Sequence, residues 1–159
     1  MRVAVIMGGY SSEREISLKT GKQIVNALAL KGCEVVELDL SDDLGAELKQ
    51  TRPDVVFIAL HGKYGEDGTV QGFLEIMQIP YVGSKVLSSA LAMNKAMTKR
   101  LLKTDGILVP SWLELSKENF VKDKKAMEES ILSMLGLPVV IKPNQEGSSV
   151  GVSIVGNQD

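Results

Sequence analysis

The feature that most constrains the fold is an alternation of short apolar runs with helix-like segments over the first 60 residues. Apolar runs occupy residues 2–7 (RVAVIM), 34–40 (EVVELDL) and 54–60 (DVVFIAL), and the third is nearly all apolar, as a parallel strand buried on both faces should be. Helical segments are expected between them, from Ser12 to Lys31 and over 44–50. This order predicts an α/β fold with an open, Rossmann-like parallel sheet.

The first helix is expected to place an acidic residue beside the end of the first strand. Ser12 and Glu15 have the spacing of a capping box, which gives Glu15 a structural task and leaves Glu13 free. Open α/β sheets bind ligands at the carboxyl ends of their strands, so Glu13 is a candidate site residue. The alternative is a solvent-facing acid of the first turn. An apolar stripe that includes Ile16 and Ile24 is expected to pack on the sheet.

A glycine-rich loop, HGKYGEDG at residues 61–68, follows the third strand. Functional residues concentrate in loops at this edge of such sheets. His61 is the only histidine, and its near-neutral titration would suit a hydrogen bond to a small ligand. A purely structural histidine is the alternative.

The later chain predicts a helix around Val70–Met77, a short strand at 79–83, and a helical stretch from a Ser84 cap to Asp105. Residues 107–115 change in character and read as a linker or a new strand, and Ser116 caps a further helix that ends at Gly136. We therefore expect one domain over residues 1–107 and the beginning of a second over 108–159.

Residues 137–155 (LPVVIKPNQEGSSVGVSIV) predict a strand, a tight polar loop and a second strand. Lys142 supplies charge at the root of the loop. Gly147 allows close backbone approach, and Ser148 and Ser149 offer hydroxyl donors, which together suit a phosphate. An ordinary hairpin with a polar turn is the alternative.

Composition excludes several classes of function. A net charge of −2 leaves no footprint for nucleic acid or an anionic membrane. No apolar run approaches the roughly 20 residues that span a bilayer. Cys33 is the only cysteine, so no intramolecular disulfide can form and a cytoplasmic location is the default. No cluster of cysteine and histidine offers a zinc site.

Four motifs together resemble the D-alanine–D-alanine ligases, cell-wall enzymes of the ATP-grasp superfamily. They stand in order along nearly the whole chain, at residues 8–18 (GGYSSEREISL), 59–72 (ALHGKYGEDGTVQG), 79–95 (IPYVGS…SALAMNK) and 140–151 (VIKPNQEGSSVG). The resemblance implies a pre-ATP-grasp sheet in residues 1–107, followed by the start of an ATP-grasp α+β domain.

The resemblance also implies a reaction and its residues. ATP phosphorylates the carboxylate of one D-alanine, and the amine of a second attacks the acyl phosphate, which yields a peptidoglycan precursor. Glu13 would hold the ammonium of the first D-alanine, Ser148 would belong to the network that orients it, and His61 would lie beside the substrate. Glu13 and Ser148 would be the catalytic residues.

Binding of ATP is implied for a second group of residues. Lys95 and Lys142 would contact the phosphates, with Gly147 and Ser149 in the same loop. Mg²⁺ is expected as a cofactor, but no metal ligand is expected in these residues. The acidic and asparagine ligands, the adenine pocket and an arginine for the transferring phosphoryl group would lie in a further part of the molecule. A homodimer could form through residues 1–107, for example through a helix with Val70, Phe73 and Met77, unless those residues are core.

Two departures from the family pattern bear on function. Asn94 stands where relatives often have aspartate, and the chain is about half as long as the family's enzymes. We therefore expect the 159 residues alone to be inactive. The alternatives are a ligase that joins D-alanine to D-lactate or D-serine, and a non-catalytic module that binds a small ligand or nucleotide.

Overall fold

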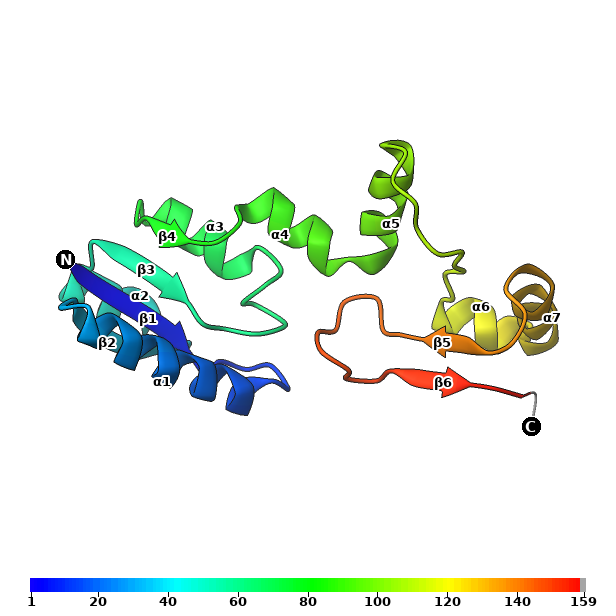
Figure 1. Ribbon diagram of the computed structural model, residues 1–159, viewed down its shortest axis with the longest axis horizontal. Coiled ribbons are helices and arrows are strands. Elements are labelled where there is room, and N and C mark those ends of the chain that lie inside the picture. The colour runs from blue at the N-terminus through cyan, green and yellow to red at the C-terminus, as the bar shows by residue number, and fades with distance from the viewer. Residues whose placement is uncertain (158–159) are drawn as a thin grey trace. The chain divides into compact units, whose positions relative to one another are not determined.

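The structure is a computed structural model that describes residues 1–157, so the last two residues of the segment expected at 108–159 lie outside the described residues. The chain divides into two compact units, Met1–Met93 and Asn94–Asp159 (Figure 1). The domain boundary at residues 107–108 stays a prediction, because compact packing units and the domains of a family need not coincide.

The first unit is the expected parallel α/β sheet. Its strands lie in the order β2-β1-β3-β4, and every neighbouring pair is parallel. The elements are β1 (Arg2–Met7), α1 (Arg14–Leu30), β2 (Glu34–Asp39), α2 (Leu44–Thr51), β3 (Val55–Ile58), α3 (Thr69–Ile76), β4 (Tyr81–Val82) and α4 (Val86–Met93). The α/β prediction is confirmed.

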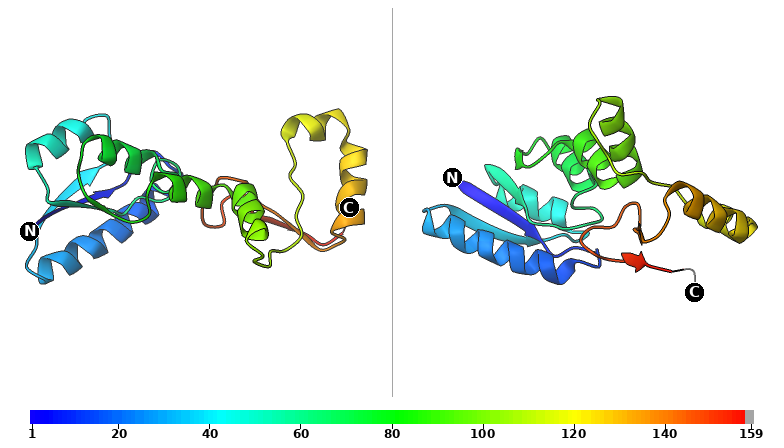
Figure 2. Two further views of the ribbon diagram at one scale, coloured as in Figure 1. Left: turned by 90° about the horizontal axis from the view of Figure 1, so that it is seen from above. Right: turned by 45° about the vertical axis from the view of Figure 1, so that its right-hand side comes forward.

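Helices cover both faces of this sheet (Figure 2). The side chains that pack α1 on one face are Val5, Met7 and Ala59 from the strand side, with Leu18, Ile24, Val25 and Leu28 from the helix. The side chains that pack α2 and α3 on the other face are Ala4, Ile6, Val56, Leu44, Leu48, Val70 and Leu74. The central strand β1 is therefore enclosed, and its carboxyl end lies in the middle of the sheet edge.

Small residues set the fit of α1 on the sheet. Ser17 and Gly21 are its buried positions, whereas Ile16 is 47% exposed, so the expected place of Ile16 in the apolar stripe is wrong. A Cβ atom at Gly21 would stand 2.7 Å from the Cβ of Met7. The helix approaches β1 too closely for a large side chain at Gly21. A pattern of large apolar residues cannot predict this contact.

The second unit holds α5 (Lys95–Thr104), α6 (Lys117–Lys122), α7 (Lys124–Met134) and the antiparallel strands β5 (Val139–Ile141) and β6 (Ser153–Val155). The strand–loop–strand expectation is thereby confirmed. Residues 107–115 form a linker without a strand, one of the two readings expected for them.

Two helices are interrupted where the sequence predicts continuity. The stretch expected from Ser84 to Asp105 ends at Met93, and α5 restarts after Asn94, whose side chain accepts a hydrogen bond from the Met97 N–H. The helix capped by Ser116 also breaks, because the side chain of Asp123 accepts from the Ala126 N–H and begins α7. Among the described residues, no helix is long and apolar enough to cross a membrane.

Candidate functional site

The carboxyl ends of β1 and β3 lie side by side, because the two strands pair in parallel with Ile6 opposite Ile58. A buried serine of α1 joins the two chain exits. Ser17 Oγ accepts from the Gly8 N–H at 2.9 Å and donates to the Ala59 carbonyl at 2.8 Å. The loops at residues 8–13 and 59–68 are therefore held together at one edge of the sheet.

Ser11 connects these two loops and supports the start of α1. Its Oγ donates to the His61 carbonyl at 2.8 Å and accepts from the Glu13 N–H at 3.2 Å. The helix begins at Arg14, and its N-cap residue, Glu13, makes no side-chain capping bond. The capping box expected from Ser12 and Glu15 is therefore wrong: the serine that contacts the backbone here is one residue earlier.

Glu13 is buried in this corner, with 5% of its surface exposed. Its Oε2 atom is buried and has no hydrogen-bond partner among the described residues. The solvent-facing alternative is therefore wrong. Removing a carboxylate oxygen from water without a partner costs on the order of 1–3 kcal/mol or more, so the geometry favours a cationic ligand group at Oε2.

Gly62 forms the wall next to this carboxylate. A Cβ atom at Gly62 would stand 2.6 Å from Glu13 Oε2, and the residue has a φ of +67°, in the left-handed region that favours glycine. Its N–H donates to Glu66 Oε2 at 2.8 Å, which fixes the loop from its far end. The absence of a side chain at residue 62 therefore lets the loop lie directly against the buried carboxylate.

His61 is half-buried, and its Nε2 lies 3.1 Å from Thr20 Oγ1 of α1. The imidazole is thereby held at the same edge of the sheet as Glu13. The hydroxyl can donate or accept, so it can serve either tautomer. The structure brings Glu13 and His61 together, as the sequence predicts for two residues at neighbouring strand exits.

Asp67 orders the loop between His61 and α3. Its carboxylate accepts from the Tyr64 N–H at 2.9 Å and from the Thr69 N–H at 3.0 Å. Burial alone would raise the pKa of Asp67, but these donors outweigh it and the pKa is lowered. The loop therefore has its own internal support.

Arg14 and Asp39 form a second set of contacts that the sequence did not single out. Arg14 Nη1 donates to Asp39 Oδ1 at 2.9 Å and to the Gly9 carbonyl at 3.1 Å, and the Gly9 N–H donates to Asp39 Oδ1 at 2.9 Å. The hydrogen bond from Arg14 is the main cause of the lowered pKa of Asp39. The sequence feature that could have indicated this contact is the position of Asp39 at the end of the second expected strand.

The expected phosphate-binding residues lie in the second unit. Lys95 Nζ donates to the carbonyl of Glu146, in the loop between β5 and β6. Lys142 directly follows β5 and is exposed. Ser148 has a φ of +52°, which marks the sharp turn of the loop. Lys95 and this loop are thus brought together, while their expected contact with ATP phosphates stays a prediction.

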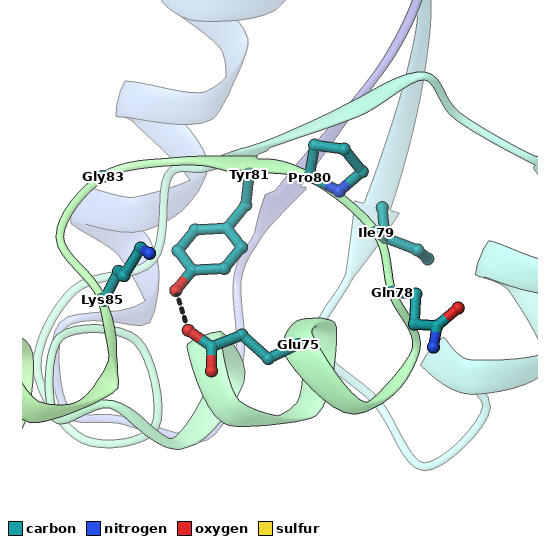
Figure 3. A pocket seen from close by; sticks show the side chains of 7 residues that line it. All are labelled: Glu75, Gln78, Ile79, Pro80, Tyr81, Gly83 and Lys85. Carbon is teal, nitrogen blue, oxygen red and sulfur yellow. Dashed lines mark hydrogen bonds between the residues drawn. The ribbon is translucent and has the colours of Figure 1, made fainter.

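A metal site and a surface depression are separate questions from the edge that carries Glu13. Among residues 1–157 no group of three or more histidine, cysteine, aspartate or glutamate side chains is placed to hold a metal ion. An open depression lies beside β4 and the end of α3, where Tyr81 donates to Glu75 Oε1 at 2.8 Å (Figure 3). None of the predicted site residues lines it, so it is separate from the edge that carries Glu13.

The first unit is an open parallel α/β sheet with a buried glutamate at its carboxyl edge, and comparison with known proteins specifies the family. Residues 37–84 match the family model described as D-ala D-ala ligase N-terminus, and residues 101–159 match the one described as D-ala D-ala ligase C-terminus. The chain belongs to the D-alanine–D-alanine ligase family.

Individual relatives agree with this assignment. The D-alanine–D-alanine ligases of Moorella thermoacetica and Aquifex aeolicus are each 52% identical over 98% of this chain and 50% of their own length. The crystal structure of the Bacillus anthracis ligase matches 99% of this chain and 50% of its own, with a TM-score of 0.82 and 45% identity. A second structure of that ligase, complexed with ATP, has a TM-score of 0.79 and 41% identity over 99% of this chain and 51% of its own. The chain spans about half the length of these relatives.

Proposed function

We propose that this chain forms part of an ATP-dependent ligase that joins two D-alanines, and that Glu13 binds the ammonium of the first. The observation that carries the proposal is the buried Oε2 of Glu13, which lacks a partner among the described residues. An ammonium group has three donors and a positive charge, so it would satisfy this oxygen and neutralise the carboxylate.

The remaining residues are assigned to the phosphoryl-transfer step. Lys95 and Lys142 would offset negative charge on the ATP phosphates while the γ-phosphoryl group passes to the D-alanine carboxylate. The backbone at Gly147 and the hydroxyl of Ser149 would contact the same phosphates. Ser148 would help to orient the first D-alanine, and His61 would contact it. These roles rest on the matched motifs and on the contact of Lys95 with the loop.

The finer parts of the proposal concern setting and assembly. The ligase would act in the cytoplasm, supply a peptidoglycan precursor, and use magnesium, for which the described residues provide no ligand cluster. A homodimer through residues 1–107 would use exposed apolar residues such as Phe73, whereas Val70 is buried in the core and is not available.

Turnover tests this proposal. Phosphate release from ATP and magnesium would be measured with and without D-alanine, on the chain alone and on a fusion to the unmatched half of the Bacillus anthracis ligase. We expect no release from the chain alone and D-alanine-dependent release from the fusion. Release by the fusion that does not depend on D-alanine would contradict the assignment. No release from a folded fusion would also contradict it, and would favour a non-catalytic ligand-binding module.

The role of Glu13 is tested in the same fusion. Glu13→Gln removes the charge at nearly constant shape, and we expect it to lower turnover severely, because a neutral amide cannot balance the ammonium. Glu15→Gln is the matched control, since Glu15 is an exposed acid of the same helical turn. Near-normal turnover by Glu13→Gln would contradict the assignment of Glu13 as the residue that binds the ammonium group.

A further inference from the structure

An asparagine, Asn144, makes several contacts between the loop that joins β5 and β6 and the first turn of α5. The Lys95 N–H donates to the Asn144 backbone carbonyl at 3.1 Å, and the Ala96 N–H donates to Asn144 Oδ1 at 2.9 Å. Asn144 Nδ2 in turn donates to Asn94 Oδ1, the N-cap oxygen of α5, at 3.0 Å. Asn144 thus contacts three consecutive residues of a segment about fifty positions away in the sequence.

These contacts use the N–H groups that a helix end would otherwise offer to an anion. Lys95 and Ala96 donate to Asn144, and the Met97 N–H donates to Asn94 Oδ1 at 3.0 Å. Helix N-termini commonly bind phosphate through these groups. In this chain two of these N–H groups hold the loop and the third is capped by Asn94, so charge for a phosphate would come from side chains.

The contacts of Asn144 with the first turn of α5 position the side chain of Lys95. Its Nζ donates to the Glu146 carbonyl, two residues after Asn144 and four after Lys142. The hydrogen bonds of Asn144 therefore determine where the Lys95 ammonium stands relative to the loop that begins with Lys142. The backbone contacts of Asn144 add to the hydrogen bond of Lys95 Nζ, since a long and flexible lysine side chain holds a loop less firmly than the backbone of a helix does.

We propose that Asn144 is a positioning residue, which holds the loop of residues 142–152 against α5 so that Lys95 and Lys142 can engage the same phosphate chain. This inference rests on the proposed role of the two lysines in ATP binding. The competing explanation is that Asn144 only caps α5. A cap would affect the helix without changing the affinity for phosphates.

The test uses the 159-residue chain, with amide exchange and ATP binding followed in one NMR experiment. Asn144→Ala is compared with Asn119→Ala, the same chemical change at an exposed position of α6. We expect Asn144→Ala to speed exchange of the Ala96 amide and to weaken ATP binding about tenfold, the equivalent of one hydrogen bond. Asn119→Ala should change neither.

Each other outcome overturns a distinct part of the account. Unchanged exchange at Ala96 would show that the contact does not hold the loop. Faster exchange with unchanged ATP affinity would reduce Asn144 to a helix cap and overturn the positioning role. If the NMR signals of Lys95 and Lys142 in the unmutated chain do not respond to ATP, the proposed role of the two lysines in phosphate binding is contradicted. The positioning role of Asn144 is then contradicted as well.

Discussion

At the scale of single residues, the site depends on a buried carboxylate oxygen and on the absence of a side chain beside it. Glu13 Oε2 has no hydrogen-bond partner among residues 1–157, and Gly62 lacks the Cβ atom that would stand 2.6 Å from that oxygen. The loop at Gly62 therefore lies directly against the carboxylate. The proposed ammonium ligand would supply the donors and the positive charge that this oxygen lacks.

Gly62→Ala should therefore abolish ligand binding at Glu13. The added methyl group would occupy the space beside Oε2 and displace the carboxylate, in addition to straining the backbone at φ +67°. D-alanine titration followed by the NMR signals of Glu13 and His61 measures the effect.

Gly32→Ala is the matched control for that variant. Gly32 has a similar φ of +77°, and nothing lies within 4 Å of its added Cβ. Both variants should lose on the order of 1–2 kcal/mol of stability from the left-handed conformation, but only Gly62→Ala should lose the response to D-alanine. A lost response in both would show that backbone strain, not the collision, is responsible.

At the scale of elements, caps decide where helices begin. The oxygen of Asn94 accepts from the Met97 N–H, which explains why α5 restarts there, and aspartate would supply an acceptor of the same shape. Asn94→Ala should destabilise the first turn of α5 by about 1 kcal/mol, whereas Asn94→Asp should be close to neutral.

Amide exchange along α5 measures this difference. The first turn should exchange faster in Asn94→Ala than in Asn94→Asp, with no difference in α1. Equal exchange in the two variants would mean that the side-chain acceptor at residue 94 does not support the helix.

A second prediction at this scale concerns the contact of Arg14 with Asp39, which joins the start of α1 to the end of β2. The pKa of Asp39 is lowered in the folded chain, chiefly by the hydrogen bond from Arg14. Its contribution to stability is therefore present above the unfolded pKa, about 3.9, and is lost as the pH falls through the folded pKa.

Asp39→Asn should lower the melting temperature near pH 7, and its difference from the unmutated chain should shrink as the pH falls below about 4 and through the lowered folded pKa. The effect should be at most about 1 kcal/mol, since both side chains are nearly half exposed. Thermal melts across this pH range measure it, and a constant difference at every pH would contradict the linkage.

At the scale of the whole molecule, hydrophobic periodicity predicted the parallel sheet and the antiparallel strand pair. Periodicity reports which residues avoid water, so it located β1 and β3 and the edge at which Glu13 and His61 meet. It could not locate Gly21 as a contact position of α1, because close approach of two backbones leaves no apolar signal.

The helix starts that differ from the sequence prediction have a common cause. Helix starts depend on which polar side chain reaches a given N–H, and several candidates lie within a few residues. Ser11 makes the contact expected of Ser12. Asn94 and Asp123 begin new helices where the sequence predicts a continuous one. The contacts of Asn144 with α5 are equally invisible in sequence, since the partners lie about fifty residues apart.

The central claim, that Glu13 recognises an ammonium group, is tested most directly by titrating the chain with D-alanine and D-lactate. The two ligands share a carboxylate and a methyl group, and differ in ammonium against hydroxyl. We predict that D-alanine shifts the signals of Glu13 and His61, that D-lactate leaves them unchanged, and that Glu13→Gln loses the response while Glu15→Gln keeps it. An equal response to both ligands, or a response that survives Glu13→Gln, would contradict the account.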